Sequence, residues 1–104
     1  MQSWTIGGSA TLGRATYKVK DGKLIKVWVV EHHGRIEKIK ITGDFFLHPE
    51  TLIDEMEAAL VNKPLNEGVI AGTIERLMKE RDATLIGASP EDIAKCIMMA
   101  AEGK

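Results

Sequence analysis

Apolar and polar residues alternate along residues 14–42, which is the pattern of half-buried β-strands. Two tight-turn signals divide this stretch, Asp21–Gly22 and His33–Gly34, and a pair of the Asp-Gly type is among the strongest short signals for a hairpin. We therefore expect three strands joined as an antiparallel meander, over residues 14–20, 24–31 and 35–42.

The second and third of these strands carry the most informative side chains. The second contains a run of β-favouring residues from Val27 to Val30. In the third, Ile39 and Ile41 share one face, whereas Ile36 falls on the other, because side chains alternate along a strand. The sequence therefore indicates a β-bulge or a frayed strand start near Ile36.

After residue 48 the spacing of apolar residues changes from two to about 3.6, which predicts helices. Pro49 and Pro90 suit first helical positions, with Ser89 as the cap before Pro90, and Asn66 opens the middle helix. Residues 84–86 form a short apolar link between the second and third helices. The expected apolar stripes of the three helices are Leu52, Ile53, Met56 and Leu60; Val69, Ile70, Ile74, Leu77 and Met78; and Ile93, Cys96, Ile97 and Ala100.

Strands followed by helices predict an α+β fold, a three-stranded antiparallel meander with three helices packed on one face of the sheet. A length of 104 residues suits one domain, whose core can form without a metal or a disulfide. Glycines are frequent and large apolar residues few at residues 1–13, so we expect a flexible lead-in there and a folded domain at residues 14–104.

Composition narrows the class of protein. The formal net charge of -1 argues against a nucleic-acid binder that relies on bulk positive charge. No apolar run approaches the roughly 20 residues that span a bilayer, and the first residues do not form a secretory signal. Cys96 is the single cysteine, which fits a reducing compartment. We expect a cytoplasmic protein that binds neither nucleic acid nor a membrane.

Motifs for catalysis are missing from the sequence. It contains no phosphate loop, no dinucleotide-binding glycine pattern and no nucleophile elbow, so we expect no active site of its own. His32, His33 and His48 lack zinc-site spacing, and we interpret them as solvent-facing residues near turns that form no metal site. Cys96 falls on an apolar stripe and is expected to be a buried structural thiol.

Two features suggest contact with a partner. Lysines gather in the strand half and acids in the helical half, which describes either a solvated sheet face or a docking face for an acidic surface, and Trp28 among these lysines favours docking. Phe45 and Phe46 follow Gly43–Asp44 and point in opposite directions on an extended segment. Either both rings pack within the fold, or one of them meets a partner.

Several segments together resemble the accessory domain of lipoate–protein ligases. They are residues 17–27, residues 34–36, and residues 39–46 followed by Pro49–Glu50. The most recognisable feature of that family is the Gly-Asp-Phe-Phe segment after the third strand, here residues 43–46, with a proline-led helix next. The resemblance covers most of the chain, from about Arg14 to the third helix. The domain ends a longer ligase chain in many bacteria and is a separate small protein in some archaea, and this chain resembles the separate form.

The resemblance implies a non-catalytic accessory subunit of a two-chain lipoate–protein ligase. Such a ligase activates lipoate with ATP to lipoyl-adenylate and transfers the lipoyl group to a lysine of an acceptor domain, in 2-oxoacid dehydrogenases or the glycine cleavage system. The large catalytic chain is the implied heterodimer partner; the complex would use ATP, Mg and lipoate, none of them bound by this chain alone. The residues expected to contact the partner are Lys18, Gly22, Lys23, Gly43, Asp44, Phe45 and Phe46.

Two other functions compete with this one. A small scaffold or carrier-binding module, related to sulfur-transfer scaffold folds, would need several ligating cysteines, and only Cys96 is present. A stand-alone enzyme is the weakest alternative, since the sequence shows no catalytic motif.

Overall fold

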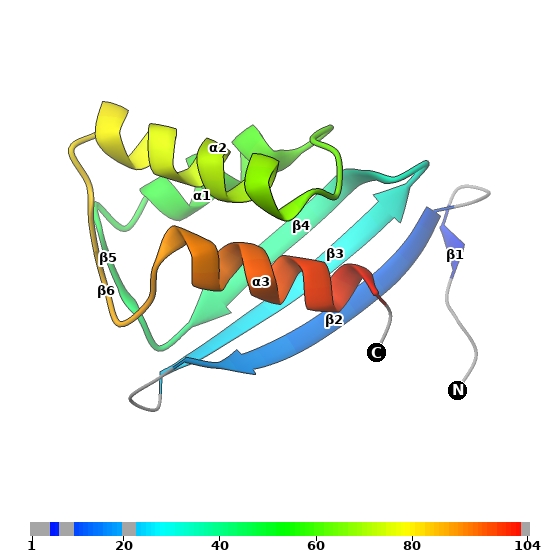
Figure 1. Ribbon diagram of the computed structural model, residues 1–104, viewed down its shortest axis with the longest axis horizontal. Helices are drawn as coiled ribbons and strands as arrows, with labels where there is room; N and C mark the ends of the chain where they lie inside the picture. The colour runs from blue at the N-terminus through cyan, green and yellow to red at the C-terminus, as the bar shows by residue number, and fades with distance from the viewer. Residues whose placement is uncertain (1–4, 7–9, 20–22, 103–104) are drawn as a thin grey trace.

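The computed structural model describes residues 5–6, 10–19 and 23–102 as a two-layer α+β domain. In this part of the chain four antiparallel strands form one sheet in the order β1-β2-β3-β4, and β5 and β6 form a separate two-stranded ribbon (Figure 1). The elements are β1 Thr5–Ile6, β2 Ala10–Lys18, β3 Leu24–His32, β4 Arg35–Gly43, β5 Phe46–His48, α1 Leu52–Leu60, α2 Glu67–Glu80, β6 Thr84–Ile86 and α3 Pro90–Ala101. The predicted meander corresponds to β2, β3 and β4, and three helices follow it, so the α+β prediction is confirmed.

The turn between β3 and β4 forms as its sequence predicts. His33 and Gly34 both adopt left-handed backbone conformations, with φ of 55° and 75°, as a two-residue hairpin turn requires. The bulge near Ile36 is also confirmed, because the register shifts beside Val30 and Glu31. This extra residue turns Ile36 onto the same face as Ile41, so that both side chains are buried in the core.

The helices begin at residues that satisfy their first backbone N–H groups. The Asn66 side chain accepts a hydrogen bond from the Val69 N–H at the start of α2. At α3, Ser89 and Asp92 form a capping box in front of a helix that starts with Pro90. These local signals fix where α2 and α3 start and therefore which of their faces turns to the core.

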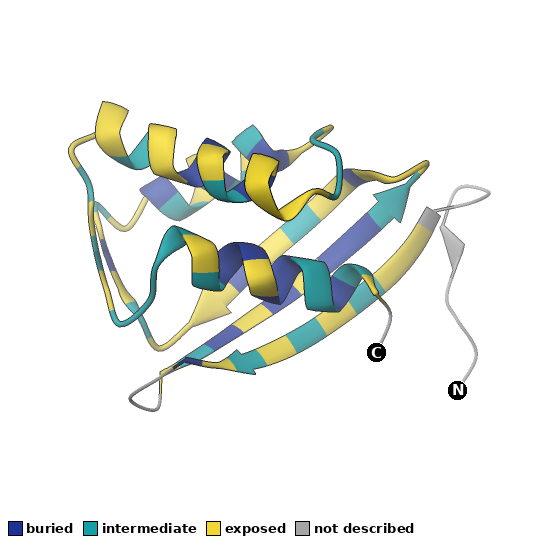
Figure 2. Cartoon of the chain, in the orientation of Figure 1, coloured by how far each residue is buried: buried dark blue, intermediate teal, exposed yellow. Residues whose placement is uncertain are grey.

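All three helices lie on the same side of the sheet. α3 packs against β2 and β3, α1 packs against β4, and α2 contacts both α1 and α3 (Figure 1). Gly13 permits the close approach of α3 to β2, because a Cβ at this position would run into the Ala100 carbonyl oxygen. On β3 the side chains of Ile25, Val27 and Val29 are buried. Figure 2 shows buried and exposed positions interleaved along the strands beneath the helices.

Several boundaries differ from the sequence prediction. β2 starts at Ala10, before the predicted Arg14, because its pairing with β3 continues to Thr11 opposite Glu31. Pro49 precedes α1 instead of starting it; its carbonyl accepts a hydrogen bond from the Leu52 N–H in a turn between β5 and the helix.

Three short strands were not predicted, and residues 84–86, expected as an apolar link, form one of them, β6. Val69, expected in the buried stripe of α2, is exposed. The predicted Asp21–Gly22 turn lies outside the described residues, and the flexibility expected for residues 1–13 stays a prediction. Among the described residues no helix is both long and apolar enough to cross a membrane.

Candidate functional site

The residues expected to contact a partner gather at one end of the sheet. Lys18 ends β2 and pairs in register with Leu24, at the start of β3. Two backbone hydrogen bonds connect the segments at this end. The Val19 N–H donates to the Lys23 carbonyl at 2.7 Å, and the Asp44 N–H donates to the Leu24 carbonyl at 2.9 Å. The fold therefore brings Lys18, Lys23 and the Gly43–Asp44 turn close together.

Gly22, which the sequence also suggested as a contact residue, lies outside the described residues. Its neighbour Lys23 reaches across to the turn that follows β6. A Cβ built on Gly87 would lie 3.1 Å from Cγ of Lys23, and Gly87 has a φ of +93°, which favours glycine. This contact joins the end of the sheet to the β5–β6 ribbon.

The two adjacent phenylalanines have different environments. Phe45 is half-buried and packs against the core, with its ring over Gly43, where a Cβ would lie 2.7 Å from ring atom Cε2. Phe46 is 54% exposed. Phe45 is therefore the ring used in packing, and Phe46 is the ring that remains available to a partner.

Phe46 belongs to a small apolar surface on the ribbon. In the β5–β6 register Phe46 is opposite Ile86, which is 58% exposed, and antiparallel partners point to the same face. The ring of His48 lies on this face too, 6.4 Å from the Phe46 ring and nearly parallel to it. We call Phe46, His48 and Ile86 the Phe46 patch. It is exposed, apolar at its centre and free of permanent charge.

Beside the Phe46 patch the surface forms an open hollow of about 360 Å³. It lies between β4, β5 and α1, and its apolar lining includes Ile41, Phe45, Leu47 and Ile53. Among the described residues that line it, Glu50 is the ionisable one. A hollow of this kind can receive an apolar side chain of another protein, and one carboxylate without a base or nucleophile does not make a catalytic site.

Sequence reasoning missed Ile86. His48 is exposed, as expected for a solvent-facing histidine, and its place in the Phe46 patch was not predicted. A signal for Ile86 was present: Thr84 and Ile86 are β-branched, and the polar–apolar order of Thr84 and Leu85 suits a short strand. What the sequence could not show is that this strand pairs with β5, which places Ile86 opposite Phe46, forty positions earlier in the chain.

The side chains of His32, His33 and Cys96 make contacts with other residues of the domain. His32 and His33 stack on each other at 4.2 Å, and Nδ1 of His32 lies 3.5 Å from a carboxylate oxygen of Glu37. Within residues 5–6, 10–19 and 23–102 no three His, Cys, Asp or Glu side chains are grouped so that they could hold a metal ion.

Cys96 is fully buried between α3 and the sheet, which confirms the prediction of a structural thiol. Its Sγ–H faces the Ala15 and Ile25 carbonyl oxygens at 3.7 and 3.5 Å. Burial raises the pKa of this thiol to about 11, so the reactive thiolate is disfavoured. A sulfur-transfer scaffold needs accessible ligating cysteines, and Cys96 does not meet that need.

An exposed apolar patch on a small α+β domain is typical of a surface that binds another protein. Residues 17–97 match the family described as the bacterial lipoate protein ligase C-terminus. Because this match covers most of the sequence, the chain belongs to that family, and the resemblance noted from residues 43–46 is confirmed.

Among solved structures, the chain is similar to one from Thermoplasma acidophilum, with 27% sequence identity and a TM-score of 0.73. The alignment covers 85% of this chain and 96% of that one. That structure is described as an archaeal lipoylation system, a bipartite lipoate protein ligase and its E2 lipoyl domain. No curated protein sequence matches this chain.

Proposed function

We propose that this chain is the non-catalytic accessory subunit of a two-chain lipoate–protein ligase. The observation that carries the proposal is the exposed Phe46–Ile86 pair, in which Phe46 belongs to the Gly-Asp-Phe-Phe segment within the part of the chain that matches the family. Exposed aromatic and aliphatic side chains without charge are typical of the centre of a stable protein interface. The Phe46 patch and its adjoining hollow are therefore the surface that binds the catalytic chain.

The two-chain arrangement is supported by the similarity to the Thermoplasma acidophilum protein. The alignment covers nearly all of that chain, so the relative is of comparable size, and the system it belongs to is described as bipartite. The partner of the present chain is accordingly a separate catalytic chain, and the two form a heterodimer.

The nucleotide and lipoate belong to the catalytic chain in this proposal. The hollow beside the Phe46 patch is largely apolar, and its described lining residues include no Lys or Arg to bind a triphosphate, so these residues do not fit ATP. ATP, Mg and lipoate therefore bind to the large chain, and the accessory subunit has no ligase activity alone. An ATP-dependent ligase of this kind acts where ATP is made and used, in the cytoplasm.

The accessory subunit raises the rate of the adenylation step. A lipoyl-adenylate is a reactive mixed anhydride that water destroys, and a domain that docks at the rim of the pocket excludes water and holds the reacting groups in place. After adenylation the lipoyl group passes to a lysine of an acceptor domain, in a 2-oxoacid dehydrogenase or the glycine cleavage system.

The decisive experiment measures pyrophosphate release from ATP and lipoate by the purified catalytic chain, with and without this subunit and without acceptor. We expect an increase of at least tenfold that saturates at one subunit per catalytic chain, and no release by the subunit alone. Equal rates with and without the subunit would remove the proposal, and activity of the subunit alone would establish it as an enzyme.

A further inference from the structure

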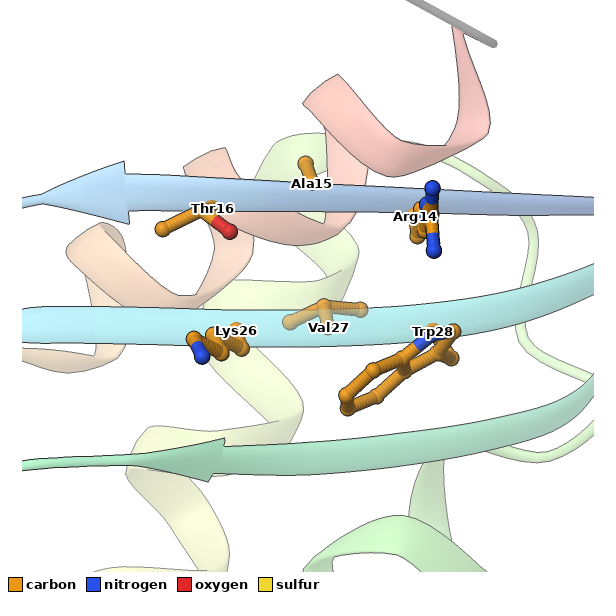
Figure 3. Close-up of a pocket in the computed structure, with 6 residues that line it drawn as sticks. All are labelled: Arg14, Ala15, Thr16, Lys26, Val27 and Trp28. Atoms are coloured by element: carbon orange, nitrogen blue, oxygen red, sulfur yellow. The ribbon is translucent and has the colours of Figure 1, made fainter.

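The face of the sheet opposite the helices is open, and it differs in chemistry from the Phe46 patch. The strand alternation that buries Ile25, Val27 and Val29 under the helices turns Lys26 and Trp28 to the other side. Figure 3 shows Arg14, Lys26 and Trp28 on β2 and β3, with the helices behind the sheet. We call this side of β2, β3 and β4 the open face.

The open face has an apolar centre. Trp28 is 38% exposed, and Leu12 is exposed at the position opposite Val30. Trp28 lies opposite Arg14 on one side and Lys40 on the other in the sheet register, so its ring is framed by two cations. A hollow of about 430 Å³ beside Trp28 is lined by Arg14, Thr16 and Lys26, among others (Figure 3).

The central part of the open face carries basic charge, whereas Glu37 adds a carboxylate beside His32 at the edge near the β3–β4 turn. The basic side chains of the open face are Arg14, Lys18, Lys26, Lys38 and Lys40. The remaining outward positions between Leu12 and Lys18, Lys26 and Val30, and Lys38 and Thr42 hold no Asp or Glu. The whole chain has a net charge of -1, so this positive surface results from segregation of charge within the fold.

Such a surface fits an acidic protein better than it fits a nucleic acid. Sheets that bind single-stranded RNA use two or three aromatic rings on which successive bases stack, and Trp28 is the aromatic residue on the described part of the open face. One aromatic anchor inside a charged rim is typical of a protein partner attracted by complementary charge.

The contrast with the Phe46 patch indicates which partner this is. An uncharged apolar patch suits the catalytic chain, which stays bound, whereas a charged face speeds the approach of a partner that must arrive and leave in every turnover. The two surfaces are continuous: Thr42 is opposite Lys26 on the open face and also lines the hollow beside Phe46. A partner on the open face would thus lie next to the catalytic chain.

We propose that the open face docks the acceptor domain, through carboxylates on the acceptor that surround an apolar spot for the Trp28 ring. The proposal rests on the proposed function, because it assumes that this chain works beside the catalytic chain. It assigns the accessory subunit a second task, which is to position the acceptor for the transfer step.

The test uses the complete heterodimer and separates the two half-reactions. The variants are Lys26→Glu combined with Lys40→Glu, and Trp28→Ala, and the matched control is Arg76→Glu, which reverses an exposed charge on α2. We expect the double variant to raise the KM for the isolated acceptor domain about tenfold and Trp28→Ala to raise it about fivefold. Pyrophosphate release without acceptor, the kcat of transfer and the thermal midpoint should stay at wild-type values, as should every parameter of the control.

Other outcomes overturn the proposal. If the double variant lowers pyrophosphate release as much as transfer, the open face binds the catalytic chain instead. If neither half-reaction changes, or if a single-stranded oligonucleotide binds the open face more tightly than the acceptor domain does, the face has another role. Failure of the proposed function is distinguishable, because the wild-type subunit would then give no increase in pyrophosphate release, and this proposal would fall with it.

Discussion

The Phe46 patch and the open face are two exposed surfaces of one small domain with opposite chemistry. The Phe46 patch sets an aromatic ring beside Ile86 without permanent charge, whereas the open face sets Trp28 among lysines and Arg14. Apolar contact gives slow dissociation, and charge gives fast association. The difference teaches that one small domain can present one surface suited to a lasting contact and another suited to a transient one.

The two surfaces are also supported by different parts of the fold. The open face is one side of a sheet whose other side is covered by α1 and α3, so packing in the core keeps its strands in place. The Phe46 patch stands on a ribbon of three-residue strands, and its position depends on Phe45 packing over Gly43. The ribbon is therefore the more easily disturbed of the two.

The largest effect is expected from Gly43→Ala, at the end of β4 where the sheet leads into the ribbon. A Cβ at Gly43 would meet the Leu24 carbonyl oxygen and lie 2.7 Å from the Phe45 ring, so the β4–β5 turn must move. We expect the free energy of unfolding to fall by about 2–3 kcal/mol, as for other steric overpacking, and binding of the catalytic chain to weaken with it. Chemical unfolding and a binding titration measure the two quantities.

Gly72→Ala is the matched control for this substitution. A Cβ at Gly72, inside α2, meets nothing within 4 Å, so alanine should stabilise the domain by about 0.5–1 kcal/mol through helix propensity. If Gly43→Ala were as stable as wild type, the ribbon would be less dependent on this contact than the structure indicates.

The second largest effect is expected from Phe46→Ser. Removal of one anchoring ring from an interface costs about 2 kcal/mol, which corresponds to roughly 30-fold weaker binding of the catalytic chain. The thermal midpoint should change little, because Phe46 is 54% exposed. Val69→Ser, at an exposed apolar position on α2, should bind like wild type, and equal losses in both variants would show that the effect is not local to the Phe46 patch.

The sequence was sufficient for most of the fold and for part of the site. Alternation, turn residues and caps act locally, so the bulge near Ile36 and the helix starts at Asn66 and Ser89 were predicted correctly. The reciprocal bond of Asp92 at the Ser89 cap was not predicted. The β5–β6 ribbon was not predicted either, because three-residue strands carry too short a pattern and their pairing is set by tertiary contacts. For the same reason the roles of Phe45 and Phe46 stayed open until the position of Gly43 beneath the Phe45 ring was known.

A change of salt concentration should affect binding at the two surfaces differently, without any mutation and by less than the substitutions above. Raising the ionic strength from about 0.05 to 0.5 M shortens the screening length from roughly 14 to 4 Å. The KM for the acceptor domain should rise about fivefold, and the affinity for the catalytic chain should stay within about twofold. The salt dependence of KM should largely disappear in the Lys26→Glu, Lys40→Glu variant. If salt instead weakened the affinity for the catalytic chain and left the KM for the acceptor domain unchanged, the partners assigned to the Phe46 patch and the open face would have to be exchanged.

The smallest functional effect is expected from Cys96→Ala, since Cys96 reaches neither surface. Both binding affinities and both half-reactions should stay within about twofold of wild type, although the lost sulfur contacts cost about 1 kcal/mol of stability. A subunit whose pyrophosphate stimulation depended on Cys96, or one whose thiol bound iron or persulfide, would instead favour the sulfur-transfer scaffold.

The pH dependence of stability reports the burial of the same thiol. Its pKa is raised from 9.0 to about 11 in the folded protein, so folding favours the protonated form. The stability that this provides is complete below pH 9 and is lost as the pH rises from 9 towards 11, by about 2 kcal/mol. Every other side chain is common to wild type and Cys96→Ala, so the difference between the unfolding free energies of the two proteins isolates the thiol. The free energy of unfolding of wild type, relative to that of Cys96→Ala, should fall as the pH rises from 9 towards 11. A difference that stays constant would mean that Cys96 is open to solvent.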